Sequence, residues 1–119
     1  MNNLVLVGCA TKEISMHVRI PVGTKIYKSS GLKKHIVKRH PDCTQYIRYI
    51  SDIISSPDYI GVNPNGSGTS FELIKTYSDN VQIGIKLDVK DNYFYVATLH
   101  TVTNAKISSR LKSGRLKIL

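Results

Sequence analysis

Three apolar segments with a period of two dominate the second half of the chain and constrain its fold more than any other feature. They cover residues 71–76, 81–87 and 93–99, and turn-forming residues separate them. In the middle segment, aliphatic residues alternate with Gln82, Gly84 and Lys86. This alternation predicts antiparallel strands with one buried and one solvated face. A short strand at 59–62, followed by a turn at 63–68, completes a predicted four-stranded antiparallel sheet.

The first half of the chain carries shorter elements. Residues 4–7, 14–20 and 25–27 have the apolar or alternating character of short strands. A helix is expected at about 31–40, capped by Ser29 or Ser30, because Pro41 discourages helical geometry at the residue before it. A second helix is expected at about 42–55, with isoleucines along one face.

A short helix is predicted near the end of the chain. Thr103 is a suitable N-cap, the helix runs through about Leu111, and Gly114 lies beyond its end. Short strands and two helices followed by an antiparallel sheet make an α+β fold. The length of 119 residues fits a single domain over 1–119.

Basic residues are concentrated in two blocks. The chain has 17 Lys and Arg against 8 Asp and Glu, for a formal charge of +9. The first block contains Lys25, Lys28, Lys33, Lys34, Lys38 and Arg39, and the second contains Lys106, Arg110, Lys112, Arg115 and Lys117, with no acid in either. Such clustering is expected of a protein that binds a polyanion, because neutralised phosphates release condensed counterions. Two solvated faces that keep the protein soluble are the alternative interpretation.

Membrane and exported classes are not indicated. The longest apolar run, at residues 4–7, is far below the roughly 20 residues that cross a bilayer, and no secretory signal opens the chain. Cys9 and Cys43 fit no paired metal spacing and are expected to stay reduced. We therefore expect a soluble, basic, cytoplasmic domain.

Two histidines accompany the first basic block. Helical geometry places His35 beside Lys38 and Arg39, and His40 at the helix end on its apolar side. Cleavage of RNA by its own 2′-hydroxyl needs a base, an acid and cations that stabilise the phosphorane. Histidines among cations supply these parts without a metal. A solvated His35 and a buried His40, neither of them catalytic, are the alternative.

Other site chemistry has less support. His35 and His40 are five residues apart rather than four, and no metal-binding motif or nucleophile elbow is present. His17 lies on the polar side of an early predicted strand. His100 follows a predicted strand, where either a solvated loop or a site is expected. Tyr93 and Tyr95 share a strand face, which fits packing or stacking on bases.

Five stretches occur in an informative order. They are Ile26-Tyr27-Lys28-Ser29-Ser30-Gly31-Leu32-Lys33-Lys34-His35-Ile36, Lys38-Arg39-His40-Pro41, Ile53-Ile54-Ser55-Ser56-Pro57-Asp58-Tyr59-Ile60, Tyr95-Val96-Ala97-Thr98-Leu99 and Lys112-Ser113-Gly114-Arg115-Leu116. Together they resemble the phage-type branch of the barnase/EndoU/colicin/RelE-like (BECR) nuclease fold over about residues 26–116.

This resemblance implies one or two helices before a four-stranded antiparallel sheet, and metal-independent RNA cleavage to a 2′,3′-cyclic phosphate and a 5′-hydroxyl. The family's lysine–histidine pair and late-strand threonine correspond to Lys34, His35 and Thr98, and His40 is carried over as a second histidine. Many members have an aromatic residue near His100, so the resemblance leaves the role of this histidine open. It implies no cofactor and no metal.

The sequence thus predicts a cytoplasmic endoribonuclease from a phage or another mobile element. In this hypothesis His35 and His40 share acid–base work, Lys34 and Arg110 stabilise the phosphorane, and Thr98 orients the phosphate. The RNA backbone is held by Lys38, Arg39, Lys106, Lys112 and Arg115. RNA, with tRNA as one candidate, and an immunity or antitoxin protein are the expected partners. A non-catalytic RNA- or DNA-binding module is the main alternative, and a protein-binding inhibitor or structural phage component is a third.

Overall fold

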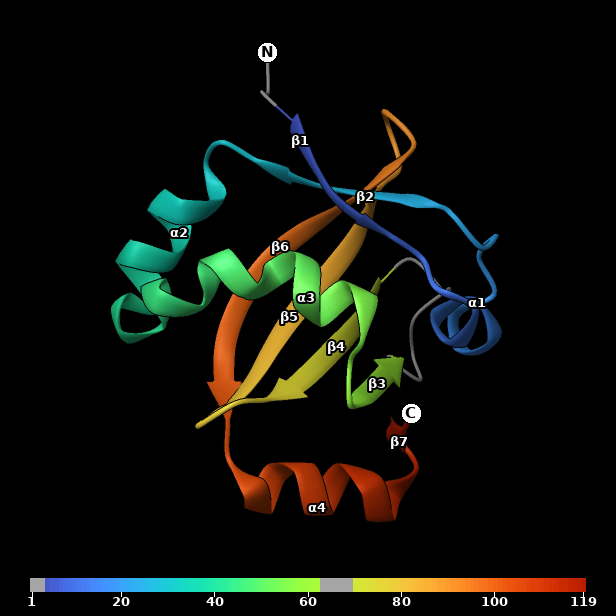
Figure 1. The fold of residues 1–119 in the computed structure, drawn as a ribbon, viewed down its shortest axis with the longest axis vertical. Coiled ribbons are helices and arrows are strands. Elements are labelled where there is room, and N and C mark those ends of the chain that lie inside the picture. The colour runs from blue at the N-terminus through green and yellow to red at the C-terminus, as the bar shows by residue number, and fades with distance from the viewer. Residues whose placement is uncertain (1–3, 63–69) are drawn as a thin grey trace.

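A computed structural model describes residues 4–62 and 70–119, coloured along the chain in Figure 1. The first half comprises β1 (Leu4–Cys9), α1 (Lys12–Val18), β2 (Lys25–Ser29), α2 (Leu32–Arg39), the 3₁₀ helix η1 (Pro41–Tyr49) and α3 (Ile50–Ser55). The second half comprises β3 (Tyr59–Val62), β4 (Ser70–Thr76), β5 (Asn80–Asp88), β6 (Tyr93–Val102), α4 (Asn104–Ser113) and β7 (Leu116–Ile118). The turn predicted at 63–68 lies outside the described residues.

The described strands form one mixed sheet of seven strands in the order β1-β2-β6-β5-β4-β3-β7. Strands β3 to β6 are the predicted antiparallel meander, so the α+β class is confirmed. The predicted count of four strands is wrong, because β1 and β2 extend one edge and β7 extends the other. Strand β2 joins β6 in parallel through only two residue pairs, and β7 is only three residues long. Neither feature leaves a periodic signal in the sequence.

The strand predicted at 14–20 is wrong, because this segment forms helix α1. The Thr11 hydroxyl caps the helix by accepting a hydrogen bond from the Ile14 amide at 3.3 Å. Ile14 and Val18, one turn apart, are buried, whereas Met16 is 73% exposed. The alternating apolar residues therefore contain an i, i+4 pair, and the cap decides in favour of the helix.

The two predicted middle helices are present, with two corrections. Gly31, rather than Ser29 or Ser30, occupies the N-cap of α2, and it makes no side-chain capping bond. The second predicted helix is divided into the 3₁₀ segment η1 and the α-helix α3. Pro41 begins η1, so the chain turns at His40 as expected of a residue before proline.

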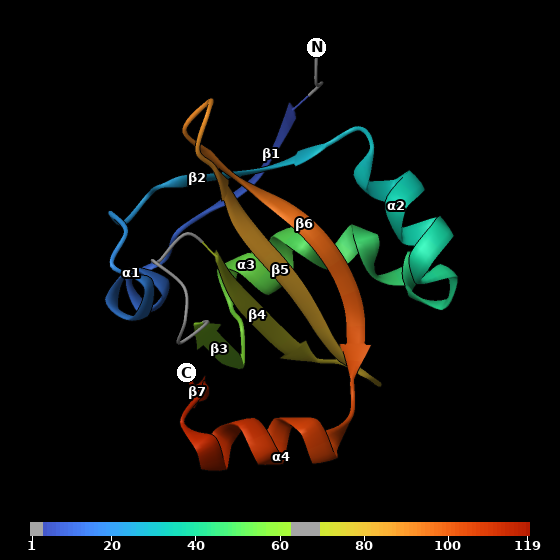
Figure 2. The same ribbon diagram turned by 180° about the vertical axis from the view of Figure 1, so that it is seen from behind.

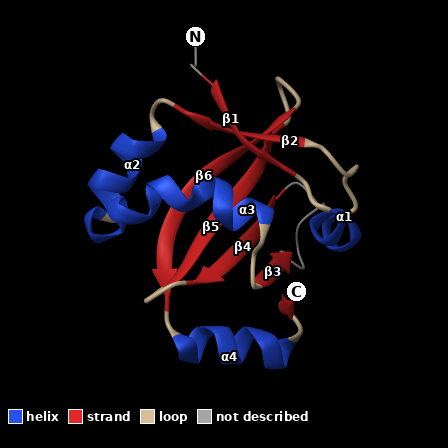
Figure 3. Ribbon diagram, in the orientation of Figure 1, coloured by secondary structure: helices blue, strands red, loops and turns tan. Residues whose placement is uncertain are grey.

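The segment η1–α3 covers one face of the sheet, where Figure 3 shows α3 in front of the strands, and α2 lies beside β6. The main core lies between these layers, where Ile36, Ile50, Ile53 and Ile54 pack with the inward-facing residues of β4, β5 and β6. Figure 2 views the molecule from behind and shows β4, β5 and β6 uncovered by these helices. We call this the open face of the sheet.

Helix α4 crosses the end of the strands (Figure 2). The predicted Thr103 cap is confirmed, since its hydroxyl accepts a hydrogen bond from the Lys106 amide at 3.2 Å. Ile107 is the buried residue of α4, and it packs in a second apolar cluster with Ile74, Val102 and Leu116. No helix among the described residues is long and apolar enough to span a membrane.

A tyrosine cluster fixes η1 and α3 against the β4–β5 turn. The Tyr46 hydroxyl donates to Asp79 at 2.6 Å, and the Tyr77 hydroxyl donates to Asp52 of α3. Burial, and next the bond to the Asp52 carboxylate, raise the pKa of Tyr77. The cluster holds the segment that follows His40 in a fixed position.

We predict that Gly8→Ala destabilises the fold by about 1–3 kcal/mol through overpacking. A Cβ at position 8 would lie 2.8 Å from Cγ2 of Ile54, whose side chain is fully buried on α3. Urea denaturation followed by circular dichroism measures the change. Gly31→Ala is the matched control, since its Cβ meets nothing nearer than 3.8 Å. Equal unfolding free energies for the two variants would contradict the close approach of β1 to α3.

Candidate active site

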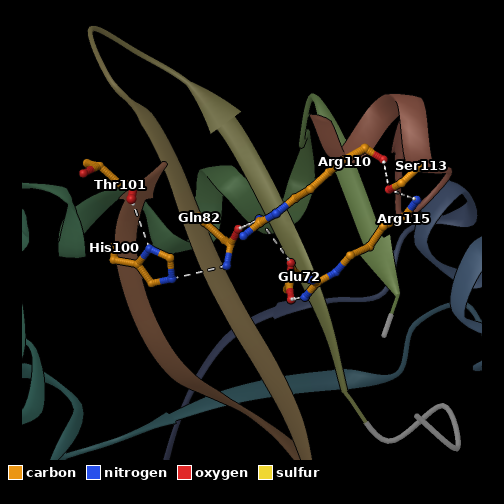
Figure 4. A network of polar contacts seen from close by, with 7 residues as sticks. All are labelled: Glu72, Gln82, His100, Thr101, Arg110, Ser113 and Arg115. Atoms are coloured by element: carbon orange, nitrogen blue, oxygen red, sulfur yellow. Dashed lines mark hydrogen bonds and ion pairs between the residues drawn. The ribbon is translucent and has the colours of Figure 1, made fainter. Parts of the chain in front are cut away.

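A row of polar side chains crosses the open face of the sheet and ends at α4 (Figure 4). Gln82 of β5 is directly opposite His100 of β6 in the antiparallel register. Gln82 is also opposite Ile74 of β4, two residues beyond Glu72. Arg110 of α4 and Arg115, which follows it, extend toward Glu72 and Gln82.

The hydrogen bonds in this row have a single consistent direction. Arg110 donates from Nη1 to Oε1 of Gln82 at 2.8 Å, which leaves the Gln82 amide nitrogen 3.3 Å from Nε2 of His100. Nδ1 of His100 lies 3.1 Å from the Thr101 carbonyl oxygen, which only accepts. His100 therefore donates from Nδ1 and accepts at Nε2. The network thus favours the His100 tautomer protonated on Nδ1, with its Nε2 lone pair directed at the Gln82 amide.

Two expectations about these residues need correction. His100 lies within β6 rather than in a solvated loop, because the strand continues to Val102. Gln82 was expected on a solvated face, yet it is only 5% exposed. Arg110 and His100 supply partners on both sides of its amide, so it is buried with its hydrogen bonds satisfied.

His40 joins His100 at the free edge of β6. Strand β2 pairs with β6 only as far as Tyr95, so among the described residues the later part of β6 has no strand beside it on that side. The rings of His40 and His100 lie 5.3 Å apart between centroids, with an interplanar angle of 37°. Buried Ile36 and Cys43 flank His40 in sequence, and each is joined to it by a backbone hydrogen bond. The helix layer therefore positions the His40 imidazole beside His100, at the edge of the sheet.

Glu72 lies between the two arginines. Its Oε1 accepts from Arg115 at 3.1 Å, and its Oε2 lies 3.7 Å from Arg110. Oε2 is buried and has no hydrogen-bond partner among the described residues. Two guanidiniums face this one carboxylate, so the local charge is net positive, which suits an anionic ligand.

Thr98 lines a hollow next to this row, together with Glu72, Gln82, Gly84 and Lys86. Gly84 is directly opposite Thr98, and a Cβ at position 84 would lie 3.0 Å from the Thr98 methyl group. The absence of a side chain at Gly84 thus leaves room in the hollow beside Thr98.

The remaining sequence-predicted residues lie apart from the row. Lys34, His35, Lys38 and Arg39 are exposed on α2, and within the described residues none has a side-chain hydrogen bond or ion pair. Lys106 and Lys112 are exposed on α4. The structure thus joins His40 to His100, and His100 through Gln82 to Arg110, but gives no contact between His35 and these groups.

Sequence reasoning did not single out Glu72 or Gln82. Both stand at polar positions of apolar strands, and the alternation alone marks such residues as solvated. A polar side chain in the middle of a strand that faces a basic helix is the signal that would have found them.

Cysteine and metal chemistry have little support in this region. Cys43 is buried, and its burial raises the pKa of the thiol, so the nucleophilic thiolate is disfavoured. Among the residues that the structure describes, no three His, Cys, Asp or Glu side chains are grouped as a metal site would need.

The family comparison agrees with this geometry. Residues 5–109 match the model of the family described as phage-Barnase-EndoU-ColicinE5/D-RelE like nuclease3. The chain belongs to this family. Family membership supports nuclease activity and a nucleic-acid substrate. The match includes Glu72, Gln82 and His100 and ends one residue before Arg110. No curated protein and no solved structure matches the chain.

We predict that neutral His100 carries its proton on Nδ1, because the Thr101 carbonyl accepts from that nitrogen. Long-range ¹H–¹⁵N NMR spectra recorded at alkaline pH distinguish protonated from unprotonated nitrogens. His17, exposed on α1, provides a reference ring in the same sample. A His100 spectrum with the proton on Nε2 would show that the network runs in the opposite direction.

Proposed function

We propose that this protein is a metal-independent endoribonuclease that cleaves RNA by attack of a 2′-hydroxyl on the adjacent phosphodiester. One observation carries the proposal: two imidazoles, His40 and His100, lie 5.3 Å apart and are linked through Gln82 to Arg110. An acid, a base and a cation at one place are the groups that this reaction needs.

In the proposed reaction, the 2′-hydroxyl displaces the Gln82 amide as the donor to Nε2 of His100, and this nitrogen takes the hydroxyl proton. The 2′-oxygen bonds to phosphorus, and the bond between phosphorus and the 5′-oxygen breaks. His40, in its protonated form, gives a proton to the leaving 5′-oxygen. The products are a 2′,3′-cyclic phosphate and a 5′-hydroxyl, and one proton has passed from His40 to RNA while His100 has gained one.

Arg110 and Arg115 stabilise the charge on the phosphorane. Their present partner is Glu72, so the scissile phosphate competes with this carboxylate for the guanidiniums. Thr98, which lines the adjoining hollow, orients a non-bridging phosphate oxygen through its hydroxyl. These roles for Arg110 and Thr98 are the ones predicted from the sequence.

The exposed cations of α2 and α4 bind the RNA backbone at positions remote from the scissile phosphate. They are Lys34, Lys38, Arg39, Lys106 and Lys112. We assign Lys34 and His35 to this group, because α2 presents them without a contact to the His40–His100 pair. This replaces the sequence-based hypothesis in which His35 and Lys34 take part in the chemistry. The phage family fits a toxin-like role in the cytoplasm, with tRNA as a candidate substrate and an immunity or antitoxin protein as a partner.

We predict that His100→Ala and His40→Ala each lower kcat by about 10²–10⁴, the usual contribution of a general acid or base. His35→Ala should change kcat less than threefold, and exposed His17→Ala is the matched control. The assay is incubation with total RNA, followed by mass spectrometry of the cyclic-phosphate ends.

A large loss in His35→Ala with full activity in His100→Ala would restore the sequence-based assignment. Absence of cyclic-phosphate ends in the wild type, with binding that weakens steeply as salt rises, would identify a non-catalytic nucleic-acid-binding module. Turnover in EDTA should equal turnover without it. A loss that added Mg²⁺ restores would contradict metal independence.

A further inference from the structure

Three tyrosines form a second feature of the open face. The rings of Tyr27 and Tyr93 meet edge-to-face at 6.2 Å, and those of Tyr93 and Tyr95 lie 5.9 Å apart. Tyr27 and Tyr95 are partners in the parallel pairing of β2 with β6. All three are half-buried, whereas the intervening Phe94 is buried against the core. The cluster thus presents aromatic surface on the side of the sheet that carries His100.

A bulge in β6 places the tyrosines on the same face of the sheet as the row of polar side chains that contains His100. Gly84 pairs with Thr98 and Ile85 with Val96, so Ala97 is an extra residue. Side chains before the bulge alternate in one phase and those after it in the other. Tyr95 and His100 therefore share the open face although they are an odd number of residues apart.

Polar side chains connect the two features. Lys86 is directly opposite Tyr95, and it lines the same hollow as Thr98, Gln82 and Glu72. Lys25 and Tyr27 line a second hollow beside Tyr93. Asp88, the last residue of β5, and Asp91, in the β5–β6 turn, lie at the far end. The positive charge of Lys86 thus favours an RNA backbone beside it, whereas the two carboxylates at the turn disfavour one.

We propose that Tyr27, Tyr93 and Tyr95 form a base-stacking subsite, which makes the substrate single-stranded RNA. This inference rests on the proposed function for the position of the scissile phosphate. Tyr95 precedes His100 by five residues, about 15 Å at the rise of an extended strand. The stacked base therefore belongs to a nucleotide further along the RNA strand from the scissile phosphate. Bases within an A-form duplex are stacked on each other and do not offer their faces to tyrosines.

The test measures binding of eight-residue 2′-O-methyl oligonucleotides, which lack the attacking 2′-hydroxyl and so are not cleaved. Tyr95→Leu removes the ring but keeps an apolar side chain, and should weaken binding about tenfold, the order expected for one base–aromatic stack. Tyr95→Phe should bind as the wild type does. Tyr49→Leu, which removes a tyrosine from the helix layer, is the matched control and should leave binding unchanged.

A double cycle with the ligand identifies the stacked base. Each oligonucleotide in a set lacks the base of one nucleotide. Removal of the stacked base should weaken binding to the wild type, whereas removal of any other base should not. Tyr95→Leu should bind the oligonucleotide without the stacked base as tightly as it binds the intact one. A hairpin stem should bind at least tenfold more weakly than a single strand of equal length. In turnover of natural RNA, Tyr95→Leu should raise KM and leave kcat within about twofold.

Equal binding of single strand and stem, or unchanged binding by Tyr95→Leu, would overturn the subsite. This outcome is separate from failure of the proposed function, since a wild type without cleavage still gives a binding result. Cleavage that needs His100, together with unchanged binding by Tyr95→Leu, would leave the proposed function in place and reject the subsite alone.

Discussion

The pairing of β5 with β6, with its single extra residue at Ala97, is the constraint on which the site depends. Val96 and Leu99 are both buried in the core although they are three residues apart, because the bulge changes the phase of the strand between them. A regular β6 that kept Val96 in the core would turn His100 inward, away from Gln82. One inserted residue therefore decides which face of the sheet carries an imidazole.

The hydrogen bonds of the network built on this pairing have fixed donors and acceptors, because the group at each end can play only one of these roles. A guanidinium only donates and a carbonyl only accepts, so Arg110 and the Thr101 carbonyl fix the orientation of Gln82 and of His100 between them. Burial of Gln82 keeps water from competing for these bonds. The proposed base is thereby held in one tautomer before any substrate binds.

Local signals in the sequence predict α4 and the buried side of β5. Thr103 and Gly114 mark both ends of α4, and the alternation in β5 marks its buried side. A similar alternation at residues 14–20 gives a wrong prediction of a strand, because the Thr11 cap and the pair Ile14 and Val18 favour a helix. Basic residues pointed to the right class of partner.

The candidate site was harder to foresee because it depends on contacts between distant residues. His40 was singled out from the sequence, but its partner His100 meets it only after the helix layer packs beside the free edge of β6. The extra residue at Ala97 has no signature in composition, and the burial of Gln82 depends on an arginine 28 positions later. Such features arise from tertiary pairing rather than from local preference.

The last strand gives α4 a second attachment to the sheet. Leu116 to Ile118 pair with β3, and the Leu119 amide donates to the Asp58 carbonyl, while Thr103 joins the other end of the helix directly to β6. A helix anchored at both ends has little freedom to swing. Arg110 and Arg115 both lie between the two anchors, so their guanidiniums are already in place when an anion binds. Less conformational entropy is then lost on capture than two arginines on a loose tail would lose.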